Sequence, residues 1–278
     1  MFMLDQKIIK KIEDFVFKQP RSMQEIAVHI EKNWRTADRY INEIIENFGT
    51  ISTKTFREGT RGALKIAYQT NIDKISHSVF QEKLEKEIMI SRKKEDFSPF
   101  DIFQFVDDRN KKSSINYKEA DNLEEYKNII LSAQKSVLFF SGNMSFINLD
   151  NKNINFSEVL DSLFKKNISI KILSRVDLQG KDNVEKTLAF NFKHKKELLE
   201  IRHDDQPIRG VIVDDKILRM KEVRIPTGKQ NELQKQTFIY YTIKDKEWVE
   251  WISKIFWKKF NNSLDARKRL DELNKIRI

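Results

Sequence analysis

The sequence predicts an α+β protein with separate N-terminal and C-terminal domains. In residues 1–71, three stretches with helical spacing of apolar residues precede two short strand-like runs. In residues 123–262, strand-like and helical stretches alternate, which is typical of an α/β sandwich around a mixed sheet. Residues 72–122 differ in composition and include the polar run 107–122, which indicates a helical connector with a polar linker. A last basic helix, capped by Ser263, is predicted for 263–278.

Composition excludes several classes of protein. The 278 residues include no cysteine, so disulfide frameworks, cysteine-ligated zinc and thiol nucleophiles are excluded. The four histidines are scattered without metal-ligand spacing, and we expect no metal or other cofactor. We expect no membrane partner, because there is no apolar run of about 18 residues. The lack of cysteine and of a secretory signal fits a cytoplasmic protein.

The chain is basic, with 52 Lys and Arg against 42 Asp and Glu and a net charge of +10. A basic balance favours a nucleic-acid partner without deciding it. Residues 1–70 hold 12 basic and 9 acidic side chains, a net of +3, whereas residues 123–278 hold 30 and 22, a net of +8. Total charge therefore does not locate an interface.

Local signals define the N-terminal elements. Apolar spacing predicts helices at 8–16, 23–31 and 36–47. Ser22 and Glu25 have the spacing of a capping box in front of the second helix. Two strand-like runs follow, 51–57 and 63–69, and the five residues between them are typical of a hairpin loop.

Three helices followed by a hairpin make a winged helix-turn-helix, and residues 22–49 resemble the helix-turn-helix of archaeal and bacterial winged-helix regulators. In such motifs the second helix of the pair enters the major groove of double-stranded DNA, led by its N-terminal residues. Here these residues are Arg35, Thr36, Arg39 and Tyr40. The hairpin offers a cationic wing for phosphates through Lys54, Arg57, Arg61 and Lys65.

The same fold also serves as a protein-interaction module, and exposed arginines are often merely solvated. Tyr40 is either a DNA contact or a core residue, and Trp34 belongs to the core. In the connector, a helix is expected at 72–92. The apolar segment 99–106 is expected to dock on a domain or a partner.

The C-terminal elements follow one another closely. Helices are expected at 123–134, 156–165, 183–192 and 248–260, and strands at 136–142, 168–174, 198–203, 208–215, 216–223 and 238–244. This order, together with the segments PIRGVIVDDKI and FIYYTIKDKEWVEWISKIFWKKF, resembles one half of a phospholipase D-type domain. The resemblance implies an active strand with the pattern His-x-Lys-x-x-x-x-Asp, in which histidine is the nucleophile and lysine binds phosphate.

This chain departs from that pattern. With Asp214 aligned, Arg209 takes the lysine position and Pro207 the histidine position. Proline cannot attack phosphorus or transfer a proton, so we expect no enzyme of this type. His203 lies four residues upstream and out of register, and His203-Asp204-Asp205 is expected to be a solvated loop rather than a metal site. Asp214 could also serve only as part of a strand-to-strand turn.

A winged helix, a helical connector and a degenerate phospholipase D-like domain together resemble the TrmB-like archaeal transcription regulators. The resemblance implies a homodimer on double-stranded DNA and a C-terminal domain that binds a small-molecule effector. Two alternatives stay open: a nucleic-acid phosphodiesterase or nuclease of phospholipase D type, and a winged-helix assembly module. The basic tail could dimerise, contact nucleic acid, or be a solvated face.

Overall fold

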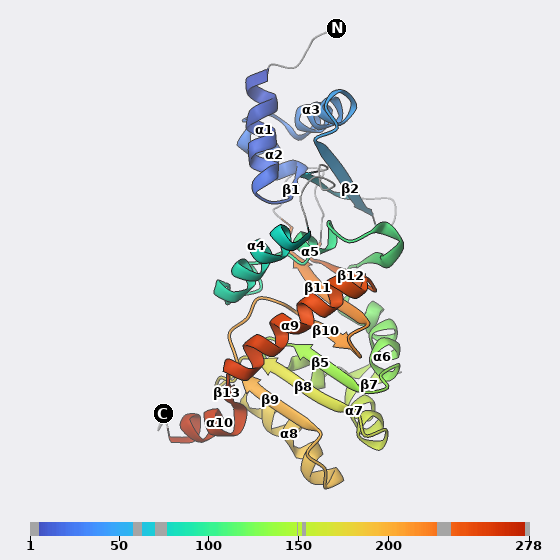
Figure 1. Cartoon of the computed structure of the whole chain (residues 1–278), viewed down its shortest axis with the longest axis vertical. Coiled ribbons are helices and arrows are strands. Elements are labelled where there is room, and N and C mark those ends of the chain that lie inside the picture. The colour runs from blue at the N-terminus through green and yellow to red at the C-terminus, as the bar shows by residue number, and fades with distance from the viewer. Residues whose placement is uncertain are drawn as a thin grey trace. The chain divides into compact units, whose positions relative to one another are not determined.

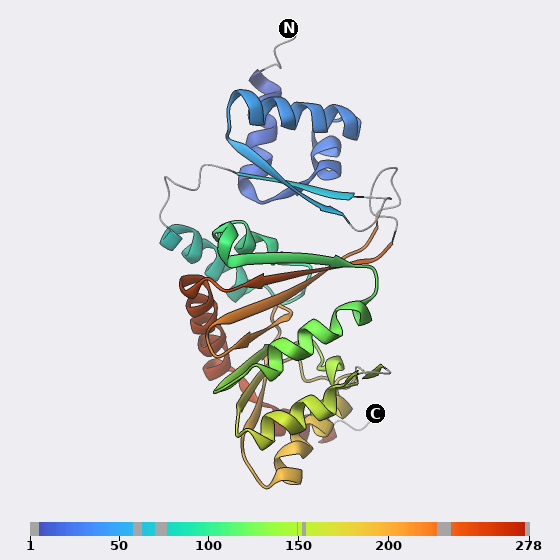
Figure 2. The same cartoon turned by 90° about the vertical axis from the view of Figure 1, so that its right-hand side faces the viewer.

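Figures 1 and 2 show the computed structural model of the chain, which describes residues 6–57, 63–69, 77–148, 150–151, 154–226 and 235–275. Two compact units are present, and each is described by itself. The N-terminal unit comprises Met1–Glu82, Phe100–Phe105 and Val223–Thr237, and the C-terminal unit comprises Lys83–Pro99, Val106–Glu222 and Phe238–Ile278. Each unit thus combines segments that are distant in sequence, and the consecutive domain boundaries expected from the sequence stay predictions. Within the described residues, no helix is long and apolar enough to cross a lipid bilayer.

The N-terminal unit has the predicted order of elements. Its helices are α1 (Gln6–Lys18), α2 (Met23–His29) and α3 (Trp34–Asn47), and its strands are β1 (Arg21–Ser22), β2 (Ile51–Arg57) and β3 (Ala63–Gln69). The strands form an antiparallel sheet in the order β1-β3-β2. The three helices enclose an apolar core in which Ile12, Ile26, Ile41 and Ile44 are fully buried. Burial of these aliphatic side chains is the main favourable term for this unit.

Local contacts define where α2 begins. The Ser22 hydroxyl accepts a hydrogen bond from the Glu25 amide at 3.2 Å, and the Glu25 carboxylate accepts one from the Ser22 amide at 2.8 Å. The predicted capping box is therefore confirmed. After α3, Gly49 has a φ of +62°, a left-handed conformation that glycine adopts without a steric penalty.

Residues 100–105, within the apolar segment 99–106, belong to the N-terminal unit and pack on its hairpin. Their short helix α5 (Phe100–Phe103) buries Phe100, whose ring centroid lies 6.1 Å from that of Phe56 and 5.6 Å from that of Tyr68. Both contacts are edge-on, a favoured arrangement of aromatic pairs. The prediction that this segment packs against a domain is confirmed.

The C-terminal unit contains an eight-stranded mixed sheet in the order β13-β9-β8-β5-β10-β11-β12-β4. The strands are β4 (Lys111–Asn116), β5 (Ser136–Phe140), β8 (Ser169–Ser174), β9 (Leu199–His203), β10 (Gly210–Val213), β11 (Ile217–Arg224), β12 (Thr237–Ile243) and β13 (Leu264–Asp265). A separate small pair is formed by β6 (Asp150–Asn151) and β7 (Ile154–Asn155). The helices are α6 (Leu123–Leu131), α7 (Phe156–Lys165), α8 (Lys181–His194), α9 (Lys246–Asn262) and α10 (Ala266–Lys275), and α4 (His77–Ile90) runs from the N-terminal unit into this one. The predicted α+β fold class is confirmed.

Helices cover both faces of this sheet (Figure 2). Strand β5 shows why, because its side chains alternate between two apolar layers. Val137 and Phe139 belong to the core that α6, α7, α8 and α10 cover. Phe140 lies on the other face, 5.1 Å from Phe256 of α9 between ring centroids. A run of apolar residues at 137–140 is therefore buried on both sides.

Two sequence-based expectations need correction. Residues 107–122 were expected to be a polar linker, but β4 lies within them and pairs with β12 as an edge strand. Only Ile115 of β4 is a large apolar residue, so the strand lacks an apolar alternation and depends on a distant partner. Ser263 was expected to cap the last helix; instead it ends α9, and its hydroxyl donates to the Lys259 carbonyl at 2.6 Å.

The capping box gives the first prediction. Ser22→Ala should lower the free energy of opening of α2 by about 1 kcal/mol, because the Glu25 amide loses its acceptor. Hydrogen exchange of the α2 amides in the full chain measures this. Ser52→Ala on β2 is the control, since no hydrogen bond of the Ser52 hydroxyl is found in the described part of the chain. Equal effects of both substitutions would contradict the assignment.

Candidate nucleic-acid interface

Helix α3 is anchored along one side. Asn33 caps it, since its side-chain oxygen accepts from the Thr36 amide at 2.8 Å. Ala37, Ile41 and Ile44 are fully buried on the side that meets α1 and α2. Burial of one stripe leaves the opposite stripe to solvent. Thr36 uses its backbone for the cap and is half-buried, so its predicted DNA contact would have to come from its side chain.

Arg35 and Arg39 are exposed and lie one helical turn apart on α3. The Arg35 guanidinium lies 5.8 Å from the ring centroid of Trp34, and that of Arg39 lies 5.3 Å from the ring centroid of Tyr40. Both rings are half-buried and pack on the three-helix core. Such cation–π contacts contribute about 0.5–1 kcal/mol at exposed sites. The contact with an aromatic ring thus restricts the conformation of each arginine side chain, while its charge faces solvent.

The hairpin lysines do not share a face. Lys54 of β2 pairs with Ile66, the neighbour of Lys65 on β3, so the two lysines project to opposite sides of the hairpin. Lys65 shares its side with Ala67, which belongs to the three-helix core. Lys54 shares the other side with Phe56. The cationic wing expected from the sequence is therefore divided between two faces.

Two wing residues cannot be placed. Arg57 ends β2, but its side chain lies outside the described residues, and so does the whole of Arg61. Their phosphate contacts stay predictions.

Lys65 already has partners within the protein. Its ammonium lies 2.6 Å from a carboxylate oxygen of Asp38 and 3.1 Å from the side-chain oxygen of Asn42, both on α3. The side chains of Lys65 and Asp38 are 23% and 29% exposed. The ion pair is thus partly shielded from water, and screening by salt weakens it less than a fully exposed pair.

The strand aligned with the phospholipase D pattern is β10. It runs antiparallel to β5, and Gly210 pairs with Phe140. Arg209 precedes β10 and Asp214 follows it, so these two residues lie at opposite ends of the strand. Five residues of extended chain separate them by roughly 16 Å. They cannot act together on one small group.

Asp214 stabilises a turn. Its φ is 53°, and its carboxylate accepts hydrogen bonds from the amides of Gln134 and Lys135 at 2.8 Å and of Ser136 at 2.9 Å. Burial acts to raise the pKa of Asp214, but the three amides outweigh it, and the pKa is lowered. These contacts support the turn interpretation of Asp214.

Arg209 lies at the carboxyl end of β5. One of its terminal nitrogens donates to the carbonyls of Gln206 at 3.0 Å and Ile208 at 2.8 Å. Its guanidinium covers Gly142, where a β-carbon would come within 2.8 Å of Nε. Burial, with the nearby charge of Arg175, lowers the pKa of Arg209 to about 10, so it stays a cation at neutral pH. Pro207 is buried beside it and offers no reactive group.

His203 is the histidine nearest to this strand in sequence. Its Nδ1 accepts a hydrogen bond from the Val176 amide at 2.9 Å. In the neutral ring the proton must then lie on Nε2, which leaves no free lone pair for attack. Asp204 was expected in a solvated loop, but it pairs with the buried Lys259 at 3.0 Å. Burial raises the pKa of Asp204 despite this cation. No cluster of three or more metal-ligating side chains occurs in the described residues.

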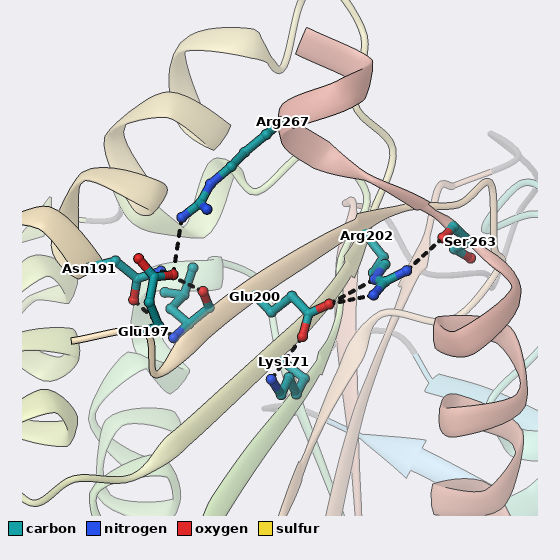
Figure 3. A network of polar contacts seen from close by, with 8 residues as sticks. Lys171, Asn191, Glu197, Glu200, Arg202, Ser263 and Arg267 are labelled. Atoms are coloured by element: carbon teal, nitrogen blue, oxygen red, sulfur yellow. Dashed lines mark hydrogen bonds and ion pairs between the residues drawn. The ribbon is translucent and has the colours of Figure 1, made fainter. Parts of the chain in front are cut away.

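Several cations of α9 and of the basic tail form ion pairs within the protein. Figure 3 shows Arg267 of α10 directed at Glu197, with an N–O distance of 3.2 Å. It also shows Arg202 between Glu200 and the Ser263 carbonyl, where β13 joins the sheet. Lys258 pairs with Glu85 at 2.7 Å, and Arg269 pairs with Glu272 at 2.8 Å. These carboxylates offset the positive charge counted in this region, which favours a structural role for part of it.

A hollow of about 680 Å³ opens in the C-terminal unit beside β4 and α6. Its walls carry four cations, Arg109, Lys111, Lys112 and Lys244. Three of these lie beside a carboxylate: Arg109 beside Asp107, Lys111 beside Asp108 and Lys112 beside Glu125. The hollow has the size of a small-molecule site, and Glu125 is the acidic residue among those that line it.

The sequence matches no protein-family model and no curated protein. Among solved structures, the chain is similar to TrmBL2, an archaeal chromatin protein whose structure shows a novel mode of DNA binding. The identity is 14% over 95% of each chain, with a TM-score of 0.39. It is also similar to NucT from Helicobacter pylori, at 16% identity over 56% of this chain and 99% of the other, with a TM-score of 0.38. A third similar structure is the phospholipase D family member Nuc from Salmonella typhimurium, at 14% identity over 56% and 97%, with a TM-score of 0.37. Likeness of this degree assigns neither a family nor a function to the chain.

The Asp214 turn gives a prediction about pH. Because the folded-state pKa is below the ordinary value of 3.8, the ionised carboxylate stabilises the fold above pH 3.8. This contribution is lost as the pH falls from 3.8 through the lowered folded-state value. Asp214→Asn keeps an acceptor and tolerates the positive φ, but it cannot titrate. We therefore expect a smaller loss of thermal stability between pH 5 and pH 2 in the variant than in the wild type.

Thermal unfolding of both proteins across this pH range measures the difference. Asp215→Asn is a matched control, since Asp215 lies next in the same turn. An identical acid response of Asp214→Asn and the wild type would contradict the role assigned to the three amide contacts.

Proposed function

We propose that this chain is a DNA-binding transcription regulator whose helix α3 reads the major groove of double-stranded DNA. The observation that carries the proposal is the presentation of Arg35 and Arg39. Both are exposed, one turn apart, near the start of the second helix of the pair, and each is steadied by a core-anchored ring. The first residues of this helix contact base edges in helix-turn-helix proteins, and arginine recognises guanine through two parallel hydrogen bonds.

The other predicted contacts have supporting roles. Thr36 offers a hydroxyl and a methyl group at the start of α3, suited to phosphate or thymine. Tyr40 supports Arg39 through its ring and packs on the core. Arg57, Arg61 and Lys54 supply cations for the phosphate backbone, where salt-dependent affinity without sequence preference is expected.

We further propose that the C-terminal unit senses or assembles rather than catalyses. Three features in and near the degenerate strand support this: Pro207 at the nucleophile position, the occupied Nδ1 of His203 at the end of β9, and the contacts of Asp214 with a turn. Homodimerisation and a small-molecule effector are parts of the proposal that come from the resemblance to TrmB-like regulators. The hollow beside β4 and α6 is where we place such an effector.

Selection of genomic DNA fragments by the purified protein, followed by salt titration on a selected fragment, tests the proposal. Arg39→Ala should lose about 1–3 kcal/mol of discrimination at one or two base positions and keep non-specific binding. Arg92→Ala removes the same charge from an exposed position outside α3 and is the matched control. An unchanged selected motif in Arg39→Ala would refute base reading by this helix.

The two alternatives have distinct outcomes in the same preparation. Absence of any DNA binding at low salt would favour a winged-helix assembly module. Cleavage of DNA without added metal that is lost in His203→Ala would favour a phosphodiesterase. Either result would contradict the proposed function.

A further inference from the structure

The contact of Lys65 with two successive turns of α3 has a geometric consequence. Asp38 and Asn42 are four residues apart, so their side chains lie one above the other on the same face of the helix. The Lys65 ammonium meets both, at 2.6 Å and 3.1 Å. One point of attachment would allow the helix to rotate about it. Two points, one turn apart, resist both rotation and sliding of α3 along β3.

The attachment lies beside the residues that carry the proposed base reading. Asp38 directly precedes Arg39, and Asn42 follows it by three positions. The buried apolar stripe of α3 decides which side of the helix faces the core, but aliphatic contacts are non-directional and leave small rotations to other contacts. The ammonium bonds are directional. They therefore add a restraint on the rotation of the segment of α3 that carries Arg35 and Arg39.

We propose that Lys65 is a positioning residue, and that its ammonium holds α3 against the hairpin so that Arg35 and Arg39 present their guanidinium groups in register with base edges. This inference rests on the proposed function of α3. It differs from the role expected of Lys65 from the sequence, which was a direct phosphate contact.

The two roles differ in their dependence on salt. Loss of a phosphate contact reduces the slope of log K against log salt concentration by about 0.9 and leaves sequence preference unchanged. Loss of a positioning contact leaves that slope unchanged and reduces preference for the selected sequence, because the arginines no longer align. We expect Lys65→Met to lower the ratio of specific to non-specific affinity by about tenfold with an unchanged slope.

Three further variants complete the binding experiment. Lys54→Met removes a cation from the opposite face of the same hairpin and is the matched control, expected to keep the sequence preference. Lys65→Arg retains a donor cation and should keep most of the preference. Asp38→Asn should lower the preference, and its effect should not add to that of Lys65→Met, since both break the same contact. A reduced slope with unchanged preference in Lys65→Met would overturn the proposal.

Hydrogen exchange of the free full-length protein tests, without DNA, whether the contact of Lys65 with Asp38 and Asn42 stabilises α3. A partly exposed ion pair contributes up to about 1 kcal/mol, so the α3 amides should exchange up to about fivefold faster in Lys65→Met. They should be unchanged in Lys54→Met. Unchanged exchange of the α3 amides in Lys65→Met would overturn the positioning role of Lys65 even if DNA binding is confirmed. A third outcome is that the α3 amides exchange faster in Lys65→Met, but the wild-type protein shows no sequence preference in DNA binding. That outcome would overturn the proposed function, and with it the role of Lys65 in positioning the arginines.

Discussion

Burial of one apolar stripe of α3 is the constraint on which the proposed interface depends. Ala37, Ile41 and Ile44 have no exposed surface, and the residues between them must therefore face the hairpin or solvent. Rotation of the helix by about 100°, the turn from one residue to the next, would move the carboxylate of Asp38 or Glu43 toward the core and expose an isoleucine. The cost of burying an unpaired charge far exceeds that of any surface contact, so the core decides which cations reach a partner.

Charge is a poor guide to function in this chain, because many cations have partners within it. In α9 and α10, the cations Lys258, Lys259, Arg267 and Arg269 each pair with a carboxylate. On the hairpin, the Lys65 ammonium bonds to α3. Arg35 and Arg39 instead lie over neutral rings, which steady a guanidinium without neutralising it. A cation is therefore a candidate DNA contact when its neighbour is a neutral ring, and a structural residue when its neighbour is a carboxylate. The number of cations does not make this distinction.

Much of the fold follows from local patterns in the sequence. The spacing of Ile26, Ile41 and Ile44 predicted α2 and α3, and the bounds of β2 and β3 were predicted to the residue because a turn-rich loop separates two strand-like runs. The α/β arrangement of the C-terminal half was predicted from its alternation of strand-like and helical stretches. Strand β4 was missed because one large apolar residue, Ile115, makes no pattern, and its partner strand β12 is distant in the chain. The tail was predicted as an uninterrupted helix, but Leu264 and Asp265 first pair with β9.

By itself, the sequence determined the helices, the hairpin, the exclusion of cysteine chemistry and the absence of a nucleophile at Pro207. These are consequences of residue type and short-range spacing, which act over a few positions of the chain. Only the tertiary structure decided what each polar side chain meets: Lys65 with Asp38 and Asn42, Asp214 with the amides at the start of β5, His203 with the Val176 amide. Hydrogen bonds and ion pairs form over about 3 Å between residues that folding brings together, and no local pattern records such partners.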